Sequence, residues 1–153
     1  MTARLSDIVT AAPDTIARAS LHIDTPGAGI VEFTRDAAAF LDRAGAGEGV
    51  LLAFLRHTSA SLTIQENADP DVQRDLMTAL ARLAPEDAVW VHDAEGPDDM
   101  PAHVKAMLTG ISLHVPVADG RMMLGTWQGL YLVEHRRRPH GREILLQFVG
   151  SKR

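Results

Sequence analysis

The run GVLLAFLR, residues 49–56, constrains the fold of this chain more than any other stretch. It is almost continuously apolar. A run of this length and character is typical of a strand that is buried on both faces at the centre of a sheet. We therefore predict a central strand here, buried on both faces, with the rest of the fold built around it.

Shorter apolar or alternating runs predict further strands, at residues 15–23, 30–33, 61–66, 88–92, 111–117, 121–125, 130–135 and 143–149. These strands follow one another as hairpins and do not alternate strictly with helices. That order favours an α+β fold, a single-domain sandwich with a largely antiparallel or mixed β-sheet and two to three helices.

The clearest helix signal covers residues 70–83. Asp69 is the expected N-cap, and Pro70 suits the first helical position. Apolar residues then recur on one face of the helix, at Val72, Leu76, Leu80 and Leu83.

Residues 35–44 and 99–109 predict the other two helices. Thr34 is the expected cap of the first, and Asp98 or Asp99 the expected cap of the second. A glycine directly follows each of these helices and is expected to end it.

Composition narrows the functional classes. The 153 residues suit one domain (residues 1–153) with a substantial core. The absence of cysteine excludes disulfides and thiol chemistry, so a metal would need His, Asp or Glu ligands. A formal net charge of −5 argues against a nucleic-acid partner. Charged residues interrupt the N-terminal apolar runs, so we expect a cytoplasmic protein with no membrane partner.

His57 follows the predicted central strand and is followed by the hydroxyls of Thr58 and Ser59. Binding sites favour such a position at the mouth of a sheet. Two interpretations stay open at this point. Either these residues bind phosphate or another ligand, or His57 is a structural residue in the core or at its rim.

The segment HDAEGPDDMPAHVK, residues 92–105, gathers charged groups at a predicted helix start. Asp99 and His103 are four residues apart and share a helix face. The free amides of a helix start attract anions, and two acids oppose that attraction unless a cation lies between them. A divalent metal would satisfy both requirements. The alternative is that the acids and His103 are simply solvent-exposed.

The C-terminal third carries two further candidate segments. Glu134 follows two leucines on one face of its predicted strand, so it needs an arginine or a protonated histidine if it is buried. The basic run 136–138 is either a solvent-exposed turn or a phosphate clamp. In GTWQG, residues 125–129, Trp127 belongs either to the core or to a binding site.

Four segments together resemble the YjbQ-type family, described as secondary thiamine-phosphate synthases: HTSASLTIQENADPDVQRDL, HDAEGPDDMPAHVK, DGRMMLGTWQGLYLVEHR and PHGRE. The resemblance runs from about residue 50 to the C-terminus. It implies a compact α+β sandwich that forms a homotrimer, with polar pockets near subunit contacts. It also implies a weak activity that joins a pyrimidine pyrophosphate to a thiazole phosphate and releases pyrophosphate.

The resemblance also implies a set of site residues. The expected catalytic residues are His57, His103, His135, Asp98, Asp99 and Glu134. The residues expected to bind phosphate or substrate are Thr58, Ser59, Asn67, Lys105, Gly125, Thr126, Trp127, Gln128 and Arg136.

A pyrophosphate leaving group needs its charge neutralised, which metal ions, arginine and lysine do in phosphate chemistry. We therefore expect a small phosphorylated metabolite as the partner and a divalent metal, Zn²⁺ or Mg²⁺, as the cofactor, with no organic cofactor. Asp98 or Asp99 is one candidate ligand. The other candidate is a zinc site at which His57, His103 and His135 converge.

Two alternative functions stay open. The same histidines and acids would serve a metal-dependent hydrolase of a small phosphorylated or amide substrate. A non-enzymatic trimer that binds a phosphorylated metabolite, or RNA through its arginines, is the third interpretation. We rank the synthase-like enzyme first, the hydrolase second and the binding protein third.

Overall fold

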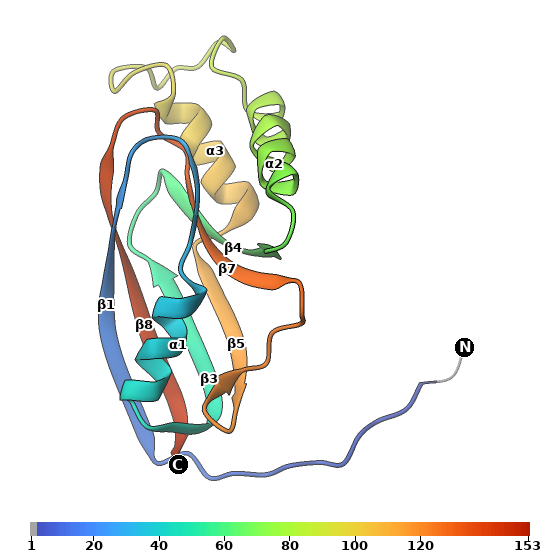
Figure 1. The fold of residues 1–153 in the computed structure, drawn as a ribbon. Helices are drawn as coiled ribbons and strands as arrows, with labels where there is room; N and C mark the ends of the chain where they lie inside the picture. The colour runs from blue at the N-terminus through green and yellow to red at the C-terminus, as the bar shows by residue number, and fades with distance from the viewer. Residues whose placement is uncertain (1–2) are drawn as a thin grey trace.

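Two antiparallel β-sheets form the body of the molecule, and three helices pack around them (Figure 1). This computed structural model describes residues 3–153. In chain order the elements are β1 (Thr15–Thr25), β2 (Gly29–Glu32), α1 (Thr34–Arg43), β3 (Ala46–Leu55), β4 (Ala60–Glu66), α2 (Pro70–Leu83), α3 (Asp99–Thr109), β5 (Ser112–Ala118), β6 (Arg121–Met122), β7 (Gln128–Glu134) and β8 (His140–Lys152).

The larger sheet has the strand order β1-β8-β3-β5-β6, and the smaller has the order β2-β7-β4. All of these strand pairs are antiparallel. Both sheets and α1 contribute side chains to one core, which includes Phe33, Leu41, Leu51, Leu62, Leu132 and Phe148. The predicted α+β sandwich is therefore confirmed.

The apolar run at 49–56 forms most of β3, which lies between β8 and β5. The predicted central position is confirmed, but burial on both faces is wrong. Leu51 and Leu55 are fully buried, whereas Phe54 on the opposite face is 46% exposed. The smaller sheet and α1 pack on the inner face of the larger sheet, so its outer face stays partly open in the single chain.

α2 begins as predicted. Pro70 is its first residue, and the carboxylate of Asp69 accepts a hydrogen bond from the Asp71 backbone N–H at 2.8 Å. The helix is amphipathic, yet none of its residues is fully buried. Its apolar side is therefore only partly covered within one chain.

The predicted cap of α1 is wrong, and the predicted cap of α3 is confirmed in position but not in its hydrogen bond. α1 begins at Thr34 itself, with Phe33 at the N-cap position. The Thr34 hydroxyl instead donates to Glu32 and accepts from the Leu130 backbone N–H, both at 2.8 Å. Asp98 occupies the N-cap position of α3 but forms no capping hydrogen bond, because its carboxylate pairs with arginine.

The segment 84–98 between α2 and α3 contains no strand, so the strand predicted at 88–92 is wrong. The two valines that flank Trp90 are fully exposed. The indole N–H of Trp90 donates to the Pro85 carbonyl at 3.1 Å. Apolar alternation alone predicted this strand, and no neighbouring strand of the described chain pairs with it.

α3 lies against β4, on the smaller sheet. The carbonyl of Gly110, which directly follows α3, accepts from the Leu62 backbone N–H at 2.9 Å. The carbonyl of Ile111 accepts from the Leu55 N–H at 2.8 Å. This packing brings the start of α3 beside the end of β7. Within residues 3–153, no helix has the length and apolar character needed to cross a membrane.

Leu51→Ala should lower the free energy of unfolding by about 2–5 kcal/mol, because Leu51 is fully buried and truncation leaves a cavity. The matched control is Leu5→Ala in the extended arm before β1, where Leu5 is 84% exposed and the change should be within about 0.5 kcal/mol. Urea denaturation measures both. Equal losses in the two variants would contradict this core.

Candidate functional site

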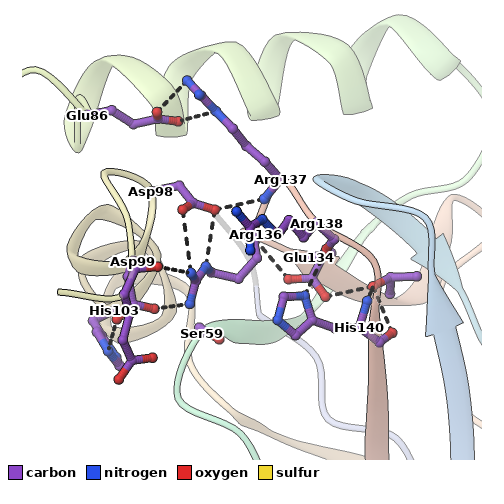
Figure 2. A network of polar contacts seen from close by, with 12 residues as sticks. Ser59, Glu86, Asp98, Asp99, His103, Glu134, Arg136, Arg137, Arg138 and His140 are labelled. Carbon is purple, nitrogen blue, oxygen red and sulfur yellow. Dashed lines mark hydrogen bonds and ion pairs between the residues drawn. The ribbon is translucent and has the colours of Figure 1, made fainter. Parts of the chain in front are cut away.

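Polar side chains from separate parts of the chain gather where β7 ends and α3 begins (Figure 2). The end of β7 and the turn after it supply Glu134, His135 and Arg136. The start of α3 supplies Asp98 and Asp99. Strands β1 and β8 and the turn before β4 complete the group.

Glu134 is the fully buried centre of this network. Arg142 donates to both of its carboxylate oxygens, at 2.7 Å from Nε and 2.6 Å from a terminal nitrogen. The Thr25 hydroxyl and the Arg136 backbone N–H donate to it at 2.8 and 2.9 Å. Burial raises the pKa of Glu134, but these hydrogen bonds outweigh burial and hold it below its ordinary value. Glu134 is buried with an arginine partner, as predicted.

Arg136 joins the end of β7 to the start of α3. Its Nε donates to Asp98 at 3.1 Å, one terminal nitrogen donates to Asp99, and the other donates to the Glu95 carbonyl at 2.9 Å. The Arg137 backbone N–H also donates to Asp98, at 2.9 Å. Burial opposes ionisation of Asp98, yet these donors lower its pKa. Arg136, predicted to bind phosphate, is thus occupied by carboxylates in this structure.

Asp99 turns its second oxygen toward two histidines. Its Oδ2 lies 2.7 Å from His92 Nε2 and 3.4 Å from His103 Nε2. Within residues 3–153, one ligand atom from each of these three residues lies within 4.8 Å of the others. Two imidazole nitrogens and one carboxylate oxygen are a donor set that suits Zn²⁺ or another divalent transition metal.

The protonation of His103 follows from its second nitrogen. His103 Nδ1 lies 3.0 Å from the carbonyl oxygen of Thr58. A carbonyl only accepts, so Nδ1 carries the proton, and Nε2 of the neutral ring presents a lone pair. That lone pair faces the carboxylate of Asp99. Two facing acceptors need a proton or a metal ion between them, and a backbone carbonyl on the other ring nitrogen is the usual support of a metal-binding histidine.

The predicted zinc set of His57, His103 and His135 is not brought together among residues 3–153. His57 Nε2 accepts a hydrogen bond from the Glu143 backbone N–H at 2.9 Å. His135 Nε2 bonds to the Ser61 hydroxyl at 2.8 Å, and its Nδ1 is buried without a partner. Only His103 belongs to the group of potential ligands.

Sequence reasoning missed His92 as a site residue. His92, Asp99 and His103 all lie within residues 92–105, so their spacing could have indicated the group. The apolar alternation just before His92 predicted a strand there, which would have carried the residue away from α3. An irregular segment instead returns His92 to the first turn of the helix.

Three of the predicted ligand-binding residues have contacts within the fold. Thr58 contributes its backbone carbonyl to His103. The Ser59 hydroxyl is buried and accepts from Arg142 at 3.1 Å. Lys105 is also buried, and loss of hydration lowers its pKa although the Asp98 carboxylate opposes that shift. Ser59 therefore contacts the Glu134–Arg142 pair, and Lys105 is buried in the fold.

The predicted residues at 125–128 lie at the opposite end of β7. The Gly125 N–H donates to the side-chain oxygen of Gln128 at 2.8 Å, and the Asn67 N–H donates to the Trp127 carbonyl at 3.0 Å. β7 extends from Gln128 to Glu134, which is about 20 Å for a strand of this length. Trp127 is 64% exposed and is not part of the core.

A shallow, open cavity of about 370 Å³ lies beside the group formed by His92, Asp99 and His103. It is lined by His57, Thr58, His103, Ala106, Met107, Gly110 and Ile111. The cavity brings His57 and His103 to one concave surface, with apolar side chains from α3 and the following turn as its other wall. It is large enough for a small organic ligand.

The stability of the protein should depend on pH through His135. Burial, with the Lys105 and Arg142 charges, lowers the pKa of His135 to about 4. Below the ordinary histidine pKa of 6.5, His135 binds a proton in the unfolded chain but stays neutral in the folded chain. Stability should therefore fall as pH drops from 6.5 toward 4, by on the order of 3 kcal/mol.

Urea denaturation between pH 7 and pH 4.5 measures this loss. His135→Gln keeps a polar group for Ser61 and removes the titration, so its stability should fall less over the same range. Parallel pH curves for the variant and the wild type would contradict the assignment.

Comparison with known proteins assigns this chain to a family. The model of the UPF0047 protein YjbQ-like family matches residues 19–151. A UPF0047 protein of Synechocystis is 49% identical over 132 residues, which cover 86% of this chain and 90% of that protein. The UPF0047 protein YugU of Bacillus subtilis is 40% identical over 123 residues, 79% of this chain and 89% of that protein.

Solved structures of other proteins also match the fold of this chain. A conserved hypothetical protein of Thermus thermophilus is 38% identical with a TM-score of 0.74, over 83% of this chain and 97% of that one. A hypothetical protein of Aeropyrum pernix is 26% identical with a TM-score of 0.82, over 88% and 99%. The chain therefore belongs to the UPF0047 YjbQ-like family.

Proposed function

We propose that this protein is an enzyme that holds a divalent metal between His92, Asp99 and His103 and acts on a small phosphorylated metabolite. One observation carries the proposal. The Thr58 carbonyl fixes the proton of His103 on Nδ1 and so aims the lone pair of Nε2 at the Asp99 carboxylate. Without a cation or a proton between them, these two acceptors would repel each other.

The second support is the state of the nearby arginine. A phosphate substrate needs positive charge, and the charge of Arg136 is already balanced by Asp98 and Asp99. A bound divalent metal would supply the missing neutralisation of phosphate oxygens. Arg136 has a different task in this proposal, which is to hold one oxygen of Asp99 so that the other faces the histidines.

The resemblance to secondary thiamine-phosphate synthases supplies the first reaction to test. In that reaction a pyrimidine pyrophosphate and a thiazole phosphate give thiamine phosphate, and pyrophosphate leaves. A leaving group of such high negative charge fits a metal-dependent site. The cavity beside His103 offers an apolar wall on which a small ring can pack.

Purified protein should form thiamine phosphate from the two precursors above a mock purification, lose this activity with a chelator and regain it with Zn²⁺, Co²⁺ or Mg²⁺. His103→Ala should lower the rate by about 100-fold or more, because it removes a metal ligand. His114→Ala is the matched control, since His114 is an exposed histidine of β5.

Isothermal titration with the metal alone separates binding from activity. Equal metal affinity and equal rates in His103→Ala and the wild type would contradict the proposal. Metal-dependent release of phosphate or pyrophosphate without any joined product would instead favour a hydrolase.

We also propose the homotrimer that the resemblance implies. Exposed apolar side chains support it, with Met107 and Leu108 on α3 near the site and Met123 and Trp127 near the opposite end of β7. Two different surfaces that meet head to tail can close into a ring. In such a ring, the turn at 125–128 of one copy would approach the site of the next.

Light scattering should give a mass three times that of the 16.6-kDa chain. Met107→Glu should shift the protein toward the monomer, because it introduces a charge on a surface that the neighbour would cover. Leu5→Glu, in the exposed arm, is the control and should leave the mass unchanged. A monomeric wild type at micromolar concentration would contradict the trimer.

A further inference from the structure

His57 is the histidine of the cavity that the proposed metal site does not use. Its Nε2 accepts a hydrogen bond from the backbone N–H of Glu143 at 2.9 Å. A backbone N–H can only donate, so Nε2 must present its lone pair. The neutral ring therefore carries its proton on Nδ1.

The backbone around His57 keeps this arrangement in place. The Arg56 N–H donates to the Glu143 carbonyl at 3.2 Å, directly beyond the paired part of β3 and β8. The His57 ring then accepts from the Glu143 N–H of β8, where a backbone carbonyl on the β3 side would otherwise accept. Burial and the nearby Arg142 guanidinium lower the pKa of His57, although the Glu134 and Glu143 carboxylates favour its protonation. A ring whose Nε2 accepts a hydrogen bond is neutral, and the lowered pKa acts in the same direction.

His57 and His103 line the same cavity with opposite polarity. The backbone N–H on Nε2 makes His57 a donor through Nδ1–H. The Thr58 carbonyl on Nδ1 makes His103 an acceptor through Nε2. The rest of the wall is largely apolar, with Ala106 and Met107 from α3 and Ile111 from the turn after it.

We infer that His57 binds the substrate as a neutral hydrogen-bond donor, giving its Nδ1–H to an anionic oxygen of an organic phosphate or phosphonate that lies in this cavity. The apolar wall receives the carbon group attached to that phosphorus. This inference rests on the proposed function for the class of substrate. It also excludes two other roles for His57. A ring with this tautomer has no free lone pair with which to act as a general base or as a metal ligand.

The tautomer can be measured first, on metal-free protein, so that the result does not depend on the proposed metal site. Long-range ¹H–¹⁵N correlation spectra of ¹⁵N-histidine-labelled protein at pH 7 distinguish the two ring nitrogens. His57→Gln identifies the signal. A proton on Nδ1 is the expected result. A proton on Nε2, or on both nitrogens, would overturn the inference.

Ligand binding is measured next, with phenylphosphonate and inorganic phosphate as probes. Co²⁺-loaded protein reports anion binding through its visible absorption. His57→Phe keeps a planar ring and removes the donor, so the Kd for phenylphosphonate should rise about tenfold or more, while the affinity for Co²⁺ stays unchanged. His114→Phe is the matched control. Phenylphosphonate should bind more tightly than inorganic phosphate, because only its phenyl group reaches the apolar wall.

Equal phenylphosphonate affinity in His57→Phe and the wild type would overturn the inference, as would equal affinity of the wild type for the two probes. If wild-type protein fails to bind Co²⁺, the proposed metal site is contradicted, and the role of His57 is tested without the metal. The titration is then followed through the His57 Nδ1–H resonance. An unchanged resonance on adding phenylphosphonate would overturn the role of His57.

Discussion

The buried pair of Glu134 and Arg142 is the interaction on which the site depends. An ionised carboxylate with no exposed surface is stable only if its charge and lone pairs are matched. Arg142 of β8 matches it with two hydrogen bonds, and Thr25 of β1 adds a third. The pair therefore ties the smaller sheet, through β7, to two strands of the larger one. It also fixes the main chain just beyond β7, because the Arg136 N–H bonds to the same carboxylate.

From that fixed main chain, positive and negative side chains follow one another toward the surface. The guanidinium of Arg136 reaches the start of α3 and holds Asp98 and Asp99 side by side. Two adjacent carboxylates would otherwise repel each other. Because one oxygen of Asp99 is held by Arg136, the other is left to the two histidines. The site is thus joined to the buried Glu134–Arg142 pair through the Arg136 backbone N–H and then through the ion pairs of the Arg136 side chain.

Features set by neighbours in sequence were predictable, and those set by distant neighbours were not. The Asp69 cap, the stop at Gly110 and the hairpin of β5 and β6 follow from local backbone chemistry. The predicted succession of hairpins is otherwise wrong, because the other strand pairs of the described chain join strands that are not consecutive in sequence. The need of Glu134 for a partner followed from its position after two leucines. The choice of Arg142 over Arg136 depends on how the smaller sheet, which contains β7, packs against β8 of the larger sheet. The valines around Trp90 alternate like a strand, yet they lack a paired neighbour. The turn at 125–128 belongs to the same sequence motif as Glu134 and Arg136, but the length of β7 separates it from the site.

Three histidines of one motif set also look alike in sequence and differ in chemistry. A backbone N–H on Nε2 makes His57 a donor through Nδ1–H, and a backbone carbonyl on Nδ1 leaves Nε2 of His103 as an acceptor. His135, bonded to Ser61 and shielded from water, is held neutral inside the fold. In His57 and His103 the deciding partner is a main-chain group, whose position is set by strand pairing and by the turn before β4. The fold therefore sets the two tautomers through its backbone: the main chain of β8 holds His57, and the turn before β4 holds His103.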